Sequence, residues 1–162
     1  MKKGLKFFKK INWKILVCSA IAVYATAFFG SLFTSAGVKS FWFSTIRPSI
    51  TPPNWVFPLV WNILFFMIFL SLYLSLTSAK NKKVKCKLEI VFGINLILNF
   101  LWSFFYFWFR NPLLAFFDLV ALESSILILI YLISKISRKA SLLLIPYFIW
   151  VAFAGLLNYL SI

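Results

Sequence analysis

The sequence predicts an all-α integral membrane protein, a bundle of five transmembrane helices that forms one domain over residues 1–162. Of its residues 63% are hydrophobic and only 12% are charged, which is far more apolar than an ordinary soluble domain. Five segments also reach the roughly 20 apolar residues that a helix needs to cross a bilayer. These segments cover about 15–36, 52–78, 88–109, 112–134 and 141–161.

Basic residues alternate between the connections of the five spans. Lys and Arg number 17 against three acids, and 14 of the 17 lie in the N-terminal tail and in the second and fourth loops. Because basic loops stay in the cytoplasm, the N-terminus is expected to be cytoplasmic and the C-terminus outside. The lysine-rich loops and the lack of a targeting segment favour a multi-pass protein of a prokaryotic plasma membrane. No separate basic domain exists, so the expected partners are membrane lipids and not nucleic acid.

The first span, about 15–36, follows a basic start but is too long for the apolar part of a signal peptide. It contains Ala27, Ser31 and Ser35 at i+4 spacing. Such a row of small residues is typical of a close contact between membrane helices.

The first loop, residues 37–51, is the longest connection and is expected to act as a lid. Its segment VKSFWFSTI is predicted to form a short helix or turn at the membrane interface. Four of the six prolines follow between residues 48 and 58. Taking Thr51 as the N-cap places Pro52 and Pro53 in the first helical turn, where proline costs no hydrogen bond, and predicts a kink at Pro58. The prolines indicate either a plain helix start or a rigid wall shared by loop and helix.

Polar residues in the third span form one stripe. Asn95, Asn99 and Ser103 follow at i+4 spacing, and Trp102 shares their face. The stripe indicates either interhelical hydrogen bonds or a ligand site. Trp61 lies too deep in the second span to be a headgroup anchor, so its N–H is expected to find a partner, for which the asparagines of the stripe are candidates.

The fourth span carries two acids that do not form an acid–base pair. Asp118 and Glu123 are five residues apart, which places them roughly 140° apart around a helix. The chain has no histidine, and Cys18 and Cys86 lack metal-binding spacing. No classical catalytic site and no protein-built metal site are therefore expected.

In the fifth span Trp150, Ala154 and Asn158 share one helical face. The small pair Ala154 and Gly155 leaves room beside the indole. This pattern indicates either a slot for a flat molecule or close helix packing.

Three motifs on these spans resemble those of the TspO/translocator-protein family, the tryptophan-rich sensory proteins, whose eukaryotic members are known as peripheral-type benzodiazepine receptors. The motifs are FWFSTIRPSITPPNWVFPLVW (41–61), NFLWSFFYF (99–107) and PYFIWVAFAGLLN (146–158). The chain departs from the family pattern at Phe43, where tyrosine is common, and at Ile50, where tryptophan is usual.

The resemblance implies a five-helix bundle, often a homodimer, with a pocket closed by the first loop. It implies binding or sensing of tetrapyrroles such as protoporphyrin IX and haem, as ligands rather than required cofactors, and of other flat apolar molecules. The alternatives that it implies are light-dependent porphyrin degradation, made doubtful by the missing phenol at residue 43, and porphyrin or sterol transport. The implied ligand-binding residues are Trp42, Phe43, Pro52, Trp61, Asn99, Trp150 and Ala154.

Overall fold

The computed structural model describes residues 11–162, and every regular element within them is a helix. In chain order the elements are α1 (Trp13–Gly37), α2 (Phe41–Ile46), α3 (Val56–Ser78), α4 (Lys82–Ser103), η1 (Phe104–Trp108), α5 (Pro112–Ser134), α6 (Arg138–Leu142) and α7 (Ile145–Tyr159). Five helical segments are long and apolar enough to cross a membrane: α1, α3, α4 with η1, α5, and α6 with α7. The predicted all-α, five-span fold is confirmed.

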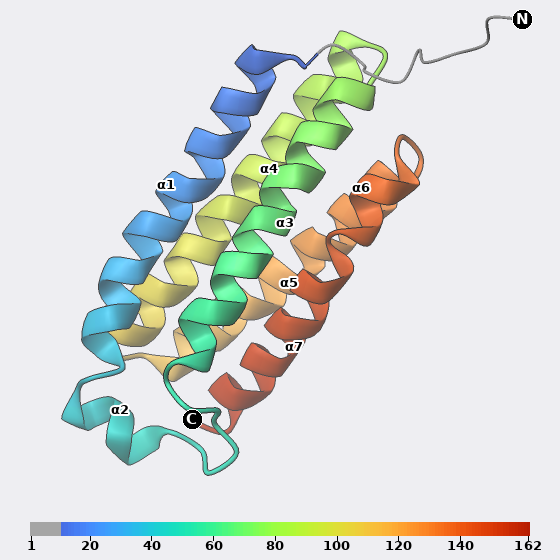
Figure 1. Cartoon of the computed structure of the whole chain (residues 1–162). Coiled ribbons are helices and arrows are strands. Elements are labelled where there is room, and N and C mark those ends of the chain that lie inside the picture. The colour runs from blue at the N-terminus through green and yellow to red at the C-terminus, as the bar shows by residue number, and fades with distance from the viewer. Residues whose placement is uncertain (1–10) are drawn as a thin grey trace, which may run out of the picture.

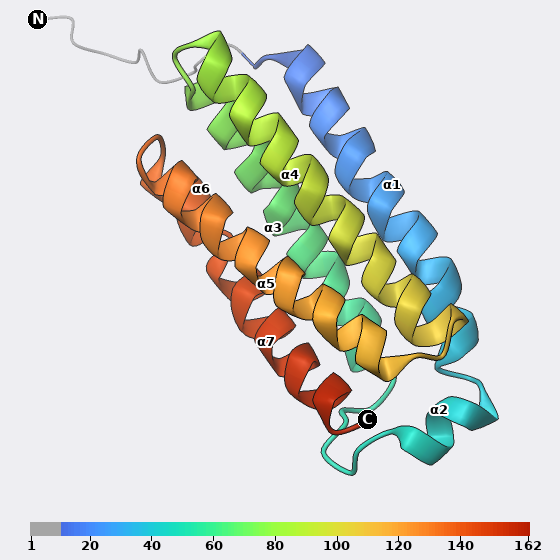
Figure 2. The same cartoon turned by 180° about the vertical axis from the view of Figure 1, so that it is seen from behind.

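The helices pack side by side, and α4 lies between α1 and α5 (Figures 1 and 2). Helix α3 packs against α1 on one side and α6 on the other, and α7 packs against α5. The start of α1 and the α3–α4 and α5–α6 connections lie at one end of the bundle, whereas α2 and the C-terminus lie at the other (Figure 1). The connections therefore alternate between the two ends as predicted. Most of the N-terminal lysines lie outside the described residues, and the orientation in the membrane stays a prediction.

Polar caps set most of the helix starts. The side chain before each of five helices accepts a hydrogen bond from a backbone N–H of the first turn, which satisfies a donor that has no partner inside the helix. These caps are Asn12 for α1, Ser40 for α2, Asn81 for α4, Asn111 for α5 and Ser137 for α6.

The predicted start of the second span is wrong. Helix α3 begins at Val56 instead of Pro52, and Thr51 is not its N-cap. The Thr51 N–H and hydroxyl both bond to the Pro48 carbonyl, at 3.0 and 2.7 Å, so the chain completes a turn before the helix can begin. Pro58 consequently lies in the first turn of α3, where its missing N–H breaks no helical hydrogen bond and no kink is required.

The third and fifth spans also differ from their predicted bounds. Helix α4 begins at Lys82, six residues before the predicted start, because Asn81 caps it and lysine is a good helix former. The fifth span is divided into α6 and α7 at Leu143 and Leu144, shortly before Pro146. Pro146 lies in the first turn of α7, and because it has no backbone N–H it cannot donate to the carbonyl four residues earlier, which accounts for the division.

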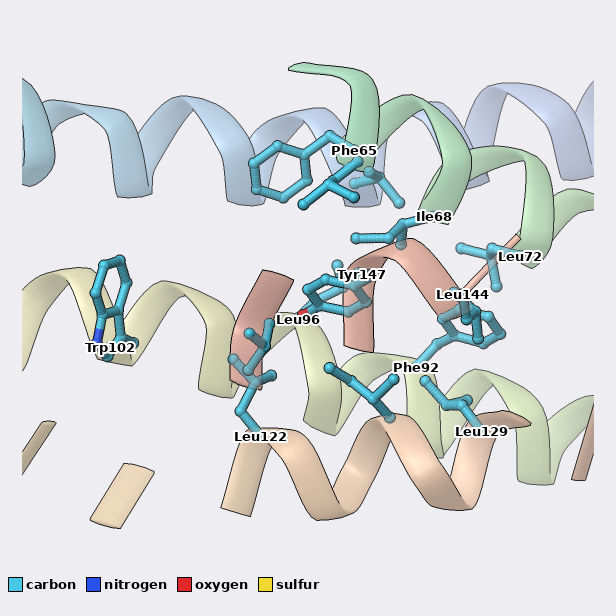
Figure 3. Packing of buried hydrophobic residues seen from close by; sticks show 14 of the residues in the cluster. Phe65, Ile68, Leu72, Phe92, Leu96, Trp102, Leu122, Leu129, Leu144 and Tyr147 are labelled. Atoms are coloured by element: carbon cyan, nitrogen blue, oxygen red, sulfur yellow. The ribbon is translucent and has the colours of Figure 1, made fainter. Parts of the chain in front are cut away.

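The core runs along the meeting line of α3, α4, α5 and α7. Figure 3 shows side chains of these helices gathered around Tyr147, whose side chain is fully buried. The largest fully buried residues include Tyr147, Phe92, Ile68, Leu122 and Leu129. Helix α1 is the least buried of the five spans, so the largest share of its surface faces away from the bundle.

Candidate functional site

The short helix α2 lies across one end of the bundle, and aromatic contacts hold it there (Figure 1). The ring centroid of Trp42 is 5.7 Å from that of Tyr106, and the centroid of Phe43 is 5.7 Å from that of Phe107. Both partners belong to the π-helix η1. A π-helical turn adds a residue per turn and so redirects these side chains toward the lid, which sequence reasoning did not predict.

Arg47 ties the rest of the lid together. Its guanidinium donates to the carbonyls of Thr51 and Pro52 and to Oδ1 of Asn54, each at 3.4 Å, and lies 5.6 Å from the centre of the Phe43 ring. The turn at Pro48 and the Arg47 contacts fix the path of residues 47–54. Of the two alternatives for the prolines, the structure favours the rigid wall, although the wall precedes α3 instead of forming its first turn.

Beneath this lid lies a cavity of about 240 Å³, the lid cavity, between α1, α3 and α4. Its aromatic lining comes from α3, and its small and polar lining comes from α1 and α4. The lining residues that the argument uses are Gly30, Ser31, Phe57, Trp61, Asn99 and Ser103.

A second space of about 40 Å³, the minor cavity, lies directly under α2. Phe43, Tyr106, Ala154 and Asn158 contribute to its wall. Some residues line both spaces, which makes them the partition between the two. This partition consists of Thr34, Val38, Phe57 and Trp61.

The structure brings four of the seven predicted ligand-binding residues to these spaces. Trp61 lines both, Asn99 lines the lid cavity, and Phe43 and Ala154 line the minor cavity. The other three are absent from the described walls of both spaces. Of these, Trp42 packs against η1, and the Pro52 carbonyl accepts a hydrogen bond from Arg47. Trp150 contacts the Phe57 ring, which lines both spaces.

Trp61 and Trp150 do not face each other across an open slot. Trp150 makes an edge-on contact with Phe57 at 6.0 Å between ring centroids, and its shielded Nε1 has no acceptor within residues 11–162. Trp61 packs against Phe65 at 5.4 Å and against Tyr147 at 6.2 Å. A ligand in the lid cavity therefore meets Trp61 and Phe57, and reaches Trp150 only if Phe57 moves.

The polar stripe of α4 serves mainly as interhelical contact. Asn99 Nδ2 donates to the Tyr147 hydroxyl at 3.0 Å, this hydroxyl donates to Asn95 Oδ1 at 3.4 Å, and Asn95 Nδ2 donates to the Ser125 hydroxyl at 2.8 Å. Trp102 Nε1 donates to Asn158 Oδ1 at 3.2 Å. The expected partnership of Trp61 with an asparagine is wrong: among the described residues Trp61 bonds to neither asparagine of the stripe, and its indole packs against the rings of Phe65 and Tyr147.

One atom of this stripe stays available to a ligand. Asn99 Oδ1 accepts no hydrogen bond from any described residue, while its Nδ2 is held by Tyr147. Asn99 lines the lid cavity. The hydrogen bond to Tyr147 thus fixes the Asn99 amide and leaves its Oδ1 as an unused acceptor at the cavity wall.

Sequence reasoning missed the contribution of α1 to the cavity. Ala27, Ser31 and Ser35 line the lid cavity together with Gly30 and Thr34. The i+3 and i+4 spacing of these residues indicates a face of α1 that lacks large side chains, and from it the sequence alone predicts a contact between helices. The same pattern fits a cavity wall, since neither use leaves room for large side chains.

The acids lie away from both lid spaces. Glu123 lines a groove between α5 and α7 with Gly155, and neither of its carboxylate oxygens has a hydrogen-bond partner in the described chain. Asp118 is buried on α5. Gly155 therefore opens this groove, while its neighbour Ala154 faces the minor cavity.

Comparison with known proteins finds similarity over nearly the whole chain. The sequence profile of the TspO/MBR family matches residues 18–161. The chain is 40% identical over 146 residues to the tryptophan-rich protein TspO of Archaeoglobus fulgidus, covering 89% of this chain and 92% of that one. It is 38% identical over 135 residues to the protein of that name from Chlorobaculum tepidum, covering 83% and 85%. It is 29% identical over 121 residues to the translocator protein of Ovis aries, covering 73% and 71%.

Proposed function

This chain belongs to the TspO/MBR family, and from that premise we propose that it is a membrane-embedded protein that binds or senses flat apolar ligands of the tetrapyrrole class under its lid. The observation that carries the proposal is the lid cavity itself, a space lined by Trp61 and Phe57 in which the Asn99 acceptor has no partner among residues 11–162. Aromatic walls with a few fixed polar groups are what such a ligand requires.

The volume of the lid cavity determines which side chains must move before a tetrapyrrole can bind. Sites for drug-sized ligands usually measure roughly 300–1,000 Å³, and the lid cavity measures about 240 Å³. Merged with the minor cavity of about 40 Å³, the lid cavity would measure about 280 Å³, so a tetrapyrrole requires the two spaces both to merge and to widen. Rotation of Phe57 and Trp61, which stand between them, would join the two spaces and bring the ligand toward Trp150.

The test is titration of protoporphyrin IX into the detergent-solubilised protein in the dark, followed by the porphyrin absorbance band. Trp61→Ala removes one wall and is expected to weaken binding about tenfold. Trp13→Ala is the matched control, since Trp13 is exposed at the other end of α1.

A second pair of variants tests the merging of the two spaces. Ala154→Leu places a larger side chain in the minor cavity, whereas Ala152→Leu places it in the α5–α7 groove. Binding is expected to weaken only in the first variant. Unchanged affinity in both Trp61→Ala and Ala154→Leu would contradict the proposal. Illumination of the saturated protein then addresses porphyrin degradation, which is excluded if the bound porphyrin bleaches no faster than the free compound.

A further inference from the structure

A separate cavity of about 360 Å³, the far pocket, lies at the end of the bundle opposite the lid. It occupies the same meeting line of α1, α3 and α4 as the lid cavity, near the start of α1 (Figure 1). Its apolar walls come from all three helices and include Ile15, Leu72, Leu76, Phe92 and Leu96.

The far pocket is open because small residues face each other across it. Ser19 and Ala22 line it from α1, and Gly93 lines it from α4. A Cβ atom added at Gly93 would meet no atom within 4 Å. Larger residues at these positions would fill the space, so it is a property of this sequence and not of helix geometry alone.

Polar groups without partners line the far pocket. Ser19 is 2% exposed, and its hydroxyl has no hydrogen-bond partner among residues 11–162. Lys14 and Glu89 also line the pocket, and in the described structure they form no ion pair with each other. An unpaired buried hydroxyl is costly in an apolar environment, and a ligand that bonds to it would remove that cost.

The separation between the far pocket and the lid cavity is solid. Val23 of α1 and Ile68 of α3 are fully buried, and they lie between the two sets of lining residues on their helices. On α4 the far pocket ends at Leu96, which is 7% exposed, and the lid cavity begins at Asn99. A ligand in one space therefore does not extend into the other, and each space can be tested independently.

We propose that the far pocket binds a single-chain zwitterionic amphiphile of the lysophosphatidylethanolamine type. The apolar walls accept the acyl chain, with Ser19 offering a hydrogen bond to its ester group. Lys14 attracts the phosphate, and Glu89 attracts the ammonium. Lysines of the α3–α4 connection at this end attract the phosphate of either kind of head, but at Glu89 a head that carries an ammonium gains a partner that a purely anionic head lacks.

The experiment compares lipid binding to the purified full-length chain in a neutral detergent by native mass spectrometry. Lysophosphatidylethanolamine is titrated against lysophosphatidylglycerol, which has the same chain and an anionic head. The zwitterionic lipid is expected to bind several-fold more tightly to the unmodified protein, and Glu89→Gln is expected to remove this preference. Equal or tighter binding of the anionic lipid to the unmodified protein would overturn the assignment of the head group.

A matched pair of glycine variants locates the lipid. Gly93→Leu fills the far pocket and is expected to weaken binding about tenfold. Gly155→Leu adds the same side chain where a Cβ also meets no atom within 4 Å, but in the α5–α7 groove, and should leave binding unchanged. Equal lipid affinity in the two variants would overturn the proposed location.

Cysteine labelling gives a second readout that does not depend on Gly93→Leu folding. Cys18 lines the far pocket, and Cys86→Ser leaves it as the one cysteine of the chain. Saturating lysophosphatidylethanolamine is expected to slow maleimide labelling of Cys18 at least several-fold, and unchanged labelling would overturn the proposal. Protoporphyrin IX binding should be the same with and without the lipid, so the two proposals can fail separately.

Discussion

The two faces of α4 use similar residues in opposite ways. Toward α5 and α7, Asn95 and Trp102 each donate a hydrogen bond to another helix. This face, the solid face, is filled by side chains around Tyr147 (Figure 3), and the small minor cavity reaches it at Trp102. Toward α1 and α3, the same helix lines two cavities with Asn99 and Gly93. The polar residues of α4 that face α5 and α7 stabilise the bundle, whereas those that face α1 and α3 keep hydrogen-bonding groups partly available to a ligand. Their role therefore depends on the size of the side chains that the neighbouring helix presents.

The largest effect is expected where α1 approaches η1, the continuation of α4, closely. A Cβ at Gly37 would overlap the Phe107 ring, and Phe107 is held by Trp102 and Phe43. Gly37→Ala is therefore expected to cost about 1–3 kcal/mol, measured from the thermal unfolding midpoint in detergent by circular dichroism.

Gly30→Ala is the control for that variant on the same helix. Its Cβ would lie 3.6 Å from Ser103 Oγ, an ordinary contact at the cavity wall. Stability should stay the same or rise by up to about 1 kcal/mol. If Gly37→Ala were equally tolerated, α1 would be loosely packed along its whole length.

A smaller loss is expected on the solid face. Asn158 accepts from Trp102 Nε1 and donates to the Pro112 carbonyl at 2.7 Å. Asn158→Leu removes both interhelical bonds and should cost about 1–2 kcal/mol in the same unfolding assay. Asn62→Leu, an exposed position whose amide bonds only to Pro58 of its own helix, should cost less than half as much.

Tyr147→Phe is expected to cost less again. The variant keeps the buried ring and removes two hydrogen bonds of the hydroxyl, to Asn99 at 3.0 Å and to Asn95 at 3.4 Å, each worth about 0.6 kcal/mol inside a membrane bundle. Tyr24→Phe on the exposed side of α1 is the control. A loss equal to that of the control would mean that this chain of hydrogen bonds does not stabilise the bundle.

The smallest effect is expected on the cavity face. The Ser31 hydroxyl bonds only to the Phe28 carbonyl of its own helix, so Ser31→Ala should change stability by less than about 0.5 kcal/mol. Ser125→Ala on the solid face removes the acceptor of Asn95 and should be clearly more destabilising. Equal losses, measured side by side, would show that the two faces of α4 do not differ as described.

Four of the seven ligand-binding residues that the family motifs imply lie at the lid cavity or the minor cavity. Trp61, Asn99, Phe43 and Ala154 were found because their residue types and spacing recur in the resemblance, and all four line the two lid spaces. Trp150 belongs to the same motifs but is covered by Phe57. Whether a side chain reaches a cavity depends on its neighbours on other helices, which spacing along one helix does not specify.

The sequence by itself determined the number of spans, their alternation and the polar stripe of α4, because hydrophobic length and helical periodicity are local properties of the chain. Only the tertiary structure decided that α3 begins after the proline turn, that η1 redirects Tyr106 and Phe107 under the lid, and that the small residues of α1 line cavities. These outcomes depend on which side chains of different helices meet, and such contacts form only when the bundle packs.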